Sequence, residues 1–160
     1  MATEKLKFKL ELYATMWDLP PKAELSINNK IFFSDDIKGT FDKPTVIEHE
    51  EELDAGEHKL ILNRGGKTGD QTKIDRQTGE VLSDQLLHIK SLEIDEIEIG
   101  ALIYEGVYTP VYPEPWATQQ AYAGIELEKS FKNATILGHN GTWTFKFASP
   151  FYMWLLENLY

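Results

Sequence analysis

One short segment of the chain combines aromatic rings with prolines. Tyr108, Tyr112 and Trp116 lie within nine residues, in the stretch Tyr-Thr-Pro-Val-Tyr-Pro-Glu-Pro-Trp. Proline fixes the backbone φ angle, so these prolines stiffen the segment. Flat amphipathic rings on a stiff loop suit stacking on a sugar or anchoring a protein partner. The sequence therefore predicts a ligand-binding loop here, with a buried corner that folds back on a sheet as the equal alternative.

Trp17 stands in a similar setting, directly before Asp18-Leu19-Pro20-Pro21. Neither proline can donate a hydrogen bond to a β-ladder, so we expect a strand to end before them. We add Trp17 to the candidate ligand-binding residues on the same reasoning as for Trp116, with a purely structural role as the alternative.

The polar stretch from residue 63 to residue 84 is rich in side-chain oxygens. Asn63, Asp70 and Asp84 are the candidate metal ligands in it. Calcium takes roughly six to eight oxygen ligands, from side chains and from the backbone of flexible loops. The prediction is a calcium-holding loop. A solvated polar loop is the alternative, because Asp is common in turns for backbone reasons alone.

No catalytic motif is present in the sequence. It contains no phosphate loop, dinucleotide fingerprint, G-x-S-x-G or H-E-x-x-H pattern, and no cysteine. The four histidines are His49, His58, His88 and His139. None is paired at metal-ligand spacing, so we predict hydrogen-bonded positions in the sheet for His58 and His88 and a turn role for His139. Paired acids such as Asp95 with Glu96 leave a polysaccharide hydrolase as the least favoured alternative, and we predict a binding protein rather than an enzyme.

Charge and composition limit the partners. The net charge is −10, with 26 acidic against 16 basic residues, which disfavours nucleic acid and anionic membrane surfaces. No apolar run approaches the roughly 18 residues of a membrane span, and the N-terminus carries no apolar signal segment. We therefore expect no nucleic-acid or membrane partner and a cytoplasmic location unless a particle carries the protein. Homo-oligomerisation stays open.

Short alternating segments with turns between them dominate the chain. Strands are expected at 6–14, 23–27, 31–33, 46–53, 58–63, 86–99, 101–108, 125–127, 134–137 and 142–147. The 86–99 segment is expected as one long strand with a bulge or as two strands, and Asn28-Asn29 as a tight hairpin turn. Helices are expected at 117–122 and about 150–159, the second with Ser149 as N-cap and Pro150 at its first position. A parity change between Ile89 and Leu92 predicts a β-bulge. The fold class is all-β: a single antiparallel β-sandwich or jelly roll over residues 1–160, with a short C-terminal helix.

The stretch from Ala55 to Ile99 resembles calcium-dependent carbohydrate-binding modules of the xylan-binding type. The likeness rests on a strand entered through Gly56-Glu57-His58, on the Asn63 loop, and on Asp84-Gln85-Leu86-Leu87-His88-Ile89 followed by Ile94-Asp95-Glu96-Ile97-Glu98-Ile99. The resemblance implies that Asp84 and the Asn63 loop lie near a calcium ion that also coordinates sugar hydroxyls. The chain departs from the pattern where an Asn-Asp pair is replaced by Asn63-Arg64.

The whole chain also looks like small proteins of marine T4-like tailed phages. The residues that carry this likeness are the 108–116 segment and the stretch Leu-Gly-His-Asn-Gly-Thr-Trp that ends at Trp143. It implies a virion location. The sequence thus favours a non-catalytic glycan-binding module, with a virion assembly protein that binds other virion proteins through the C-terminal helix as the alternative.

Overall fold

The computed structural model describes residues 3–15, 20–66, 73–74, 77–78, 81–83, 85–99, 106–112, 116–127, 129–132 and 135–159. Its strands are β1 (Thr3–Thr15), β2 (Lys22–Ile27), β3 (Lys30–Asp36), β4 (Thr45–Asp54), β5 (Gly56–Gly65), β6 (Lys73–Ile74), β7 (Val81–Ser83), β8 (Leu86–Ile94), β9 (Ile97–Glu98), β10 (Val107–Pro110), β11 (Phe131–Lys132), β12 (Ile136–Leu137) and β13 (Gly141–Ser149). Its helices are α1 (Trp116–Tyr122) and α2 (Phe151–Leu159). Neither helix is long and apolar enough to cross a membrane, within the part of the chain that the structure describes.

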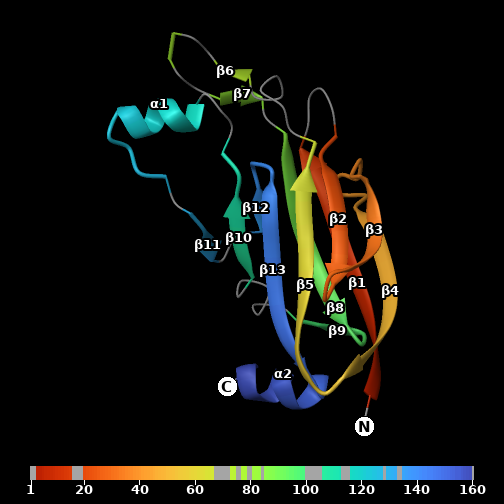
Figure 1. The fold of residues 1–160 in the computed structure, drawn as a ribbon. Coiled ribbons are helices and arrows are strands. Elements are labelled where there is room, and N and C mark those ends of the chain that lie inside the picture. Colours follow the sequence, from red (N-terminus) through yellow and green to blue (C-terminus); the bar gives the residue numbers. More distant parts are fainter. Residues whose placement is uncertain are drawn as a thin grey trace.

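Two antiparallel sheets face each other and form a β-sandwich (Figure 1). Sheet A has the strand order β12-β8-β1-β4, with β9 paired to β8. Sheet B has the order β11-β10-β13-β5-β2-β3, and β6 with β7 forms a separate small hairpin. This confirms the predicted fold class, and β5 is an interior strand of its sheet, as its apolar residues on both faces predict.

Alternation of apolar and polar residues builds the core between the sheets. On β1, Leu6, Phe8, Leu10 and Leu12 are buried while the residues between them are not. They belong to the same core cluster as the aromatic residues of β13, and the Phe8 and Phe147 ring centroids are 5.7 Å apart. Side chains on a strand alternate between faces, so this period fixes which face of each sheet is inside.

Local sequence signals determine a tight turn in sheet B and a β-bulge in sheet A. Asn28 and Asn29 have positive φ angles of 51° and 70° and form the predicted tight turn between β2 and β3. The predicted bulge of β8 lies at Lys90, because β1 residue Glu11 pairs with Ser91 and the next residue pairs with Ile89.

The remaining predicted elements differ in detail. The segment 125–127 is not a strand but a loop after α1, and its three residues do not pair with either sheet. Of the two alternatives for the 86–99 segment, the structure has two strands, joined by a turn at Asp95 and Glu96, both of which have positive φ. Residues 101–105 of the expected 101–108 strand lie outside the described residues.

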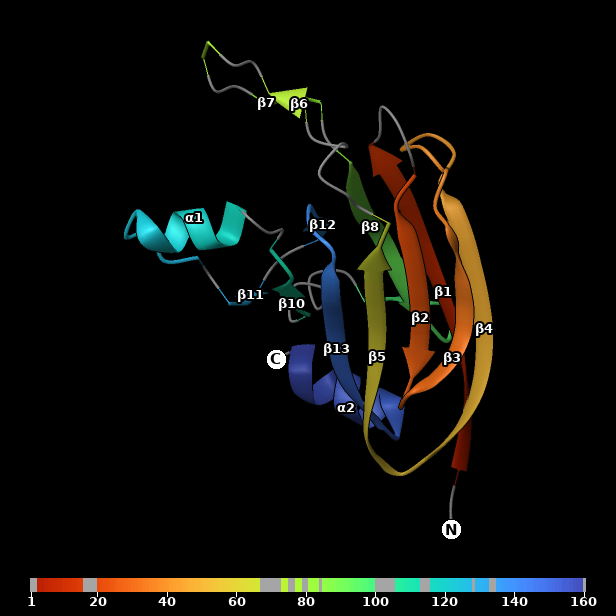
Figure 2. The ribbon, with the colours of Figure 1, turned by 45° about the horizontal axis from the view of Figure 1, so that its top comes forward.

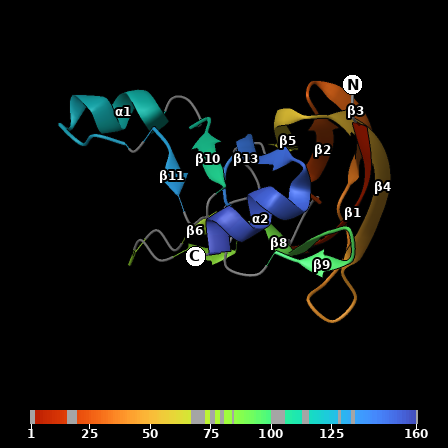
Figure 3. The same ribbon diagram turned by 90° about the horizontal axis from the view of Figure 1, so that it is seen from below.

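Helix α2 forms as predicted but begins differently. Its expected N-cap, Ser149, is the last residue of β13, and its hydroxyl donates to Glu4 Oε1 at 2.5 Å. The backbone N–H of Phe151 donates to the same carboxylate oxygen at 2.6 Å. A carboxylate from β1 therefore accepts the hydrogen bond at the helix N-terminus, which local sequence cannot reveal. The helix lies across one end of the sandwich (Figure 3), with Phe151 and Leu155 in the core.

Candidate functional site

Three rings gather at the end of the sandwich opposite α2. Tyr112 and Trp116 have ring centroids 5.9 Å apart. The His139 ring meets the edge of Tyr112 at 5.2 Å and stacks on Trp116 at 6.1 Å. We call these three residues the aromatic cluster. Separations of about 4.5–7 Å are those of favourable ring contacts, so the rings support one another as a unit.

Tyr108 lies beneath the aromatic cluster and does not present its own ring at the surface. Its side chain is only 4% exposed. The phenol hydroxyl donates to the backbone carbonyl of His139 and accepts from the His139 N–H, the latter at 3.0 Å. Burial raises the pKa of Tyr108 above its ordinary value. Tyr108, predicted as a ligand-binding residue, is therefore a support that fixes the turn carrying His139.

Sheet B positions the cluster through two neighbouring strands. Strand β10 carries Tyr108 and continues toward Tyr112, while β13 pairs with it and begins directly after the 138–140 turn. Gly141 is required at this junction, because a Cβ there would come within 2.4 Å of the Thr109 carbonyl oxygen. The Val111 N–H donates to the Asn140 carbonyl at 2.6 Å and closes the junction.

Helix α1 brings Trp116 to the cluster and stands away from the sheets (Figure 2). None of its residues is buried, and Trp116 is 38% exposed. Tyr112 and His139 are half-buried. A hollow of about 410 Å³ lies along the same helix and is lined by Ala117, Ala121, Gly124, Ile125, Glu126 and Leu127. The cluster thus combines accessible ring surface with fixed ring positions, the arrangement that stacking on a flat ligand needs.

Of the three predicted metal ligands, only Asn63 lies in the part of the chain that the structure describes. Asp70, Asp84 and the candidate ring Trp17 lie outside it. The Asn63 amide oxygen accepts a hydrogen bond of 2.8 Å from the Thr142 hydroxyl. Asn63 is exposed, whereas the next residue of β5, Arg64, is buried on the opposite face of the sheet. No group of three or more described His, Asp or Glu residues could hold a metal ion. The calcium loop with Asn63, Asp70 and Asp84 therefore stays a prediction.

The histidines in the sheets have the structural roles that the sequence predicts. His58 is buried, and its ring nitrogens contact the Asp54 carbonyl at 2.6 Å and the Asn28 amide at 2.7 Å. His88 contacts the Thr15 hydroxyl at 2.9 Å and stacks on Tyr13 at 4.3 Å. Burial lowers the pKa of His88 below its ordinary value.

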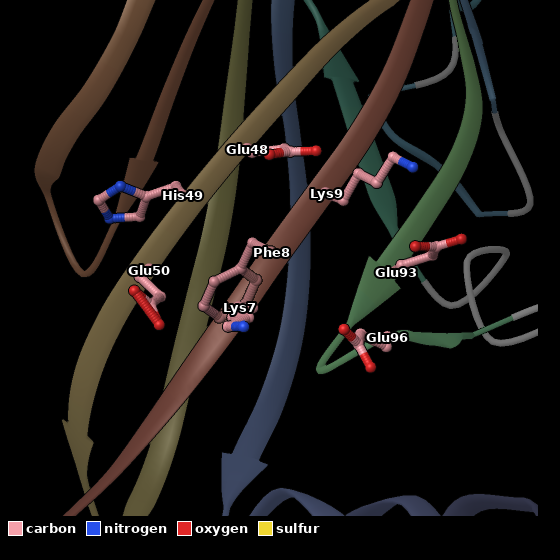
Figure 4. Close-up of a pocket in the computed structure, with 8 residues that line it drawn as sticks. All are labelled: Lys7, Phe8, Lys9, Glu48, His49, Glu50, Glu93 and Glu96. Atoms are coloured by element: carbon pink, nitrogen blue, oxygen red, sulfur yellow. The ribbon is translucent and has the colours of Figure 1, made fainter.

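A second hollow, of about 550 Å³, lies on sheet A away from the aromatic cluster. Figure 4 shows its lining residues, Lys7, Phe8, Lys9, Glu48, His49, Glu50, Glu93 and Glu96. The strand register places Lys9 between Glu48 and Glu93, and Lys7 opposite Glu50. Opposite charges facing each other across strands stabilise a sheet by about 0.2–1 kcal/mol per pair. The lysines and glutamates at these paired positions are explained as a solvated ladder of charges on the outer face of the sheet, whereas Phe8 belongs to the core and His49 stacks on Phe32 of sheet B.

The sequence analysis did not identify two residues at the end of the sandwich that carries the aromatic cluster, His139 and Arg64. His139 was expected only to form a turn, yet its ring joins the aromatic cluster. Arg64 was noted only as a departure from an Asn-Asp pair, yet it is 2% exposed. The parity of β5 held the signal for Arg64, because it shares the inward face with Leu60 and Leu62.

Comparisons with known proteins reach this chain only through its fold. No protein-family model matches the sequence, and no curated protein matches it. A solved structure of vCBM60 matches with a TM-score of 0.52 and 11% identity, over 88% of this chain and 89% of that one. Its description concerns two families of calcium-dependent carbohydrate-binding modules that are linked by circular permutation. A second structure, vCBM60 in complex with galactobiose, has a TM-score of 0.49 and 9% identity, over 87% and 96%. The first likeness shows the β-sandwich fold.

Proposed function

We propose that this protein is a non-catalytic glycan-binding domain whose binding surface is the aromatic cluster. The observation that carries the proposal is the contact of Trp116 with both Tyr112 and His139 at the exposed end of the sandwich. Apolar faces of sugar rings pack on flat aromatic rings, and half-buried Tyr and His also supply polar edges for hydroxyl groups. The fold shared with vCBM60, a carbohydrate-binding module, is consistent with this role.

Fixed ring positions favour binding, because ordering flexible side chains on association costs about 0.5–1.5 kcal/mol each. The His139 backbone is held by Tyr108 from below, and the 111–112 segment is joined to the 138–140 turn. The surface is thereby organised before a ligand arrives.

The first experiment is a glycan array with the purified chain, run once in calcium and once in EDTA. The two buffers are compared because the structure of vCBM60 is described in connection with calcium-dependent carbohydrate-binding modules. Binding that survives EDTA supports recognition by the aromatic cluster. Binding that disappears in EDTA supports the predicted calcium loop with Asp70 and Asp84. Absence of binding in both buffers contradicts the glycan role.

Trp116→Ala tests the site once a glycan is known. We expect the affinity to fall by roughly 30-fold or more, which corresponds to about 2 kcal/mol for loss of a central aromatic anchor. Isothermal titration calorimetry measures the affinity, and the melting temperature shows that the fold persists, because α1 has no buried residue.

Tyr122→Ala is the matched control. Tyr122 lies at the other end of the same helix and is 89% exposed. We expect its glycan affinity to equal that of the wild type. Equal affinity of Trp116→Ala and Tyr122→Ala would remove the aromatic cluster from the binding site.

The second candidate is assembly with another protein through α2. One face of this helix is core, but Tyr152, Met153 and Leu156 are 49–60% exposed and leave an apolar outer face for a partner. The likeness to proteins of marine T4-like phages is the basis for proposing a virion location for either role. Failure of the glycan array would make this candidate the leading one.

A further inference from the structure

Arg64 is a buried cation surrounded by oxygen atoms. Its guanidinium donates to the Gln85 carbonyl at 2.7 Å, the Asn140 Oδ1 at 3.0 Å, and the Leu137 and Gly65 carbonyls at 3.3 Å each. The side chain is 2% exposed. Burial of a charge is costly unless hydrogen bonds replace its hydration, and the four acceptors among the described residues contribute to this.

The four acceptors come from separate parts of the sandwich. Gly65 belongs to β5 in sheet B, while Leu137 belongs to β12 in sheet A and Gln85 directly precedes β8 in sheet A. Asn140 lies in the turn that also carries His139. The Gln85 side chain extends the set by donating to the Gly66 carbonyl at 3.3 Å. One guanidinium therefore joins both sheets and the turn beneath the aromatic cluster.

We propose that the Arg64 guanidinium takes the place of a structural calcium ion where β5, β12, the residue before β8 and the 138–140 turn meet. Carbonyl and amide oxygens from several loops are the ligands that calcium uses to order a loop region. Here those oxygens hold a guanidinium, whose planar fork donates to several acceptors at once. A divalent cation among the same oxygens would be repelled by it in this low-dielectric surrounding. The described residues around Arg64 are thus joined to one another without calcium.

Melting of the wild-type chain in calcium and in EDTA tests the proposal without any glycan, so its outcome is independent of the proposed function. At about 10 mM calcium, even a site with a dissociation constant of about 1 mM would raise the melting temperature by about 3 °C or more. We expect the two melting temperatures to agree within about 2 °C. A larger rise in calcium overturns the proposal.

Arg64→Gln tests the guanidinium itself. Glutamine is neutral and has too few donors for four acceptors, so buried carbonyl groups lose their partners. We expect the melting temperature to fall by at least about 6 °C, with no recovery in calcium.

Lys59→Gln is the control, because it removes the same charge from an exposed position of the same strand. We expect it to melt within about 2 °C of the wild type. Equal melting of Arg64→Gln and Lys59→Gln overturns the proposal. If Arg64→Gln does not fold, the wild-type comparison of calcium with EDTA decides alone.

Discussion

At the scale of single residues, one tyrosine hydroxyl supports the candidate binding surface. The Tyr108 phenol serves as donor to the His139 carbonyl and as acceptor from the His139 N–H. Because both groups belong to one residue, this contact fixes the backbone at His139 rather than its ring. The ring is then held by its contacts with Tyr112 and Trp116.

Tyr108→Phe removes that hydroxyl and keeps the buried ring. We expect the free energy of unfolding to fall by about 1–3 kcal/mol, since two backbone groups near the core lose a partner. Urea unfolding measures the change. Tyr122→Phe, at a side chain that is 89% exposed, should stay within about 0.5 kcal/mol of the wild type. A Tyr108→Phe variant as stable as this control would show that the hydroxyl does not hold the turn.

The sequence could identify Tyr112 and Trp116 as ring-bearing loop residues but could not separate them from Tyr108. All three share the same proline-rich segment. Their difference arises because β10 ends at Pro110 and buries Tyr108 against β13, and strand ends are set by pairing partners distant in sequence. His139 joins the cluster from 23 residues beyond Trp116, so only the tertiary structure could reveal it.

At the scale of elements, α2 depends on the first strand for its beginning. The Glu4 carboxylate on β1 accepts from both the Ser149 hydroxyl and the Phe151 N–H. A negative charge at a helix N-terminus is stabilised by the helix dipole and by hydrogen bonds to unpaired N–H groups. The contact therefore ties the two ends of the chain together.

Glu4→Gln removes the charge from this cap. We expect a loss of about 1 kcal/mol in the free energy of unfolding, because a charge-assisted hydrogen bond at a helix N-terminus becomes a neutral one. Urea unfolding again provides the measurement. Glu11→Gln makes the same change on the same strand, away from the helix, and should have little effect. A loss shared equally by both variants would count against the cap.

Element existence followed from sequence more closely than element boundaries. Alternation predicts β1, β4 and β13, and the Asn28-Asn29 pair predicts its hairpin. The segment 125–127 alternates as well, but it pairs with no strand in the described part of the chain and stays a loop. A strand needs a partner for its backbone groups, which a local pattern does not supply.

At the scale of the whole molecule, the net charge of −10 acts on every charged ligand. Neutral sugars are unaffected by the electric field of this charge. Sulfated or uronic sugars are repelled at low ionic strength, where the field reaches about 30 Å before dissolved salt screens it. The charge therefore favours neutral glycans for the proposed binding role.

A neutral glycan and its sulfated counterpart allow a direct test. We expect the sulfated form to bind several-fold more weakly than the neutral form at about 10 mM salt. The difference in affinity should narrow at about 150 mM salt, because the screening length becomes shorter. Calorimetry at both salt concentrations measures this, and the neutral form is the internal control. Binding of the sulfated form that strengthens as salt is lowered would contradict the expectation.

The sandwich class could be predicted from many short strands and few helices, but the order of strands within each sheet could not. β1 lies between β4 and β8, and β13 lies between β10 and β5. These pairings join segments far apart in the chain, and they depend on how two apolar faces pack together. No local pattern distinguishes one buried strand from another as a partner.

Strand β4 is the outer strand of sheet A, and an outer strand is a template on which other chains can add. Its middle reads Glu48-His49-Glu50-Glu51-Glu52. A second molecule that paired its own β4 here would place glutamates directly opposite glutamates, which is unfavourable. Charged side chains at a free edge are a known protection against growth of aggregated sheets. The acidic run of β4 therefore protects the fold from fibril formation even where the protein becomes concentrated.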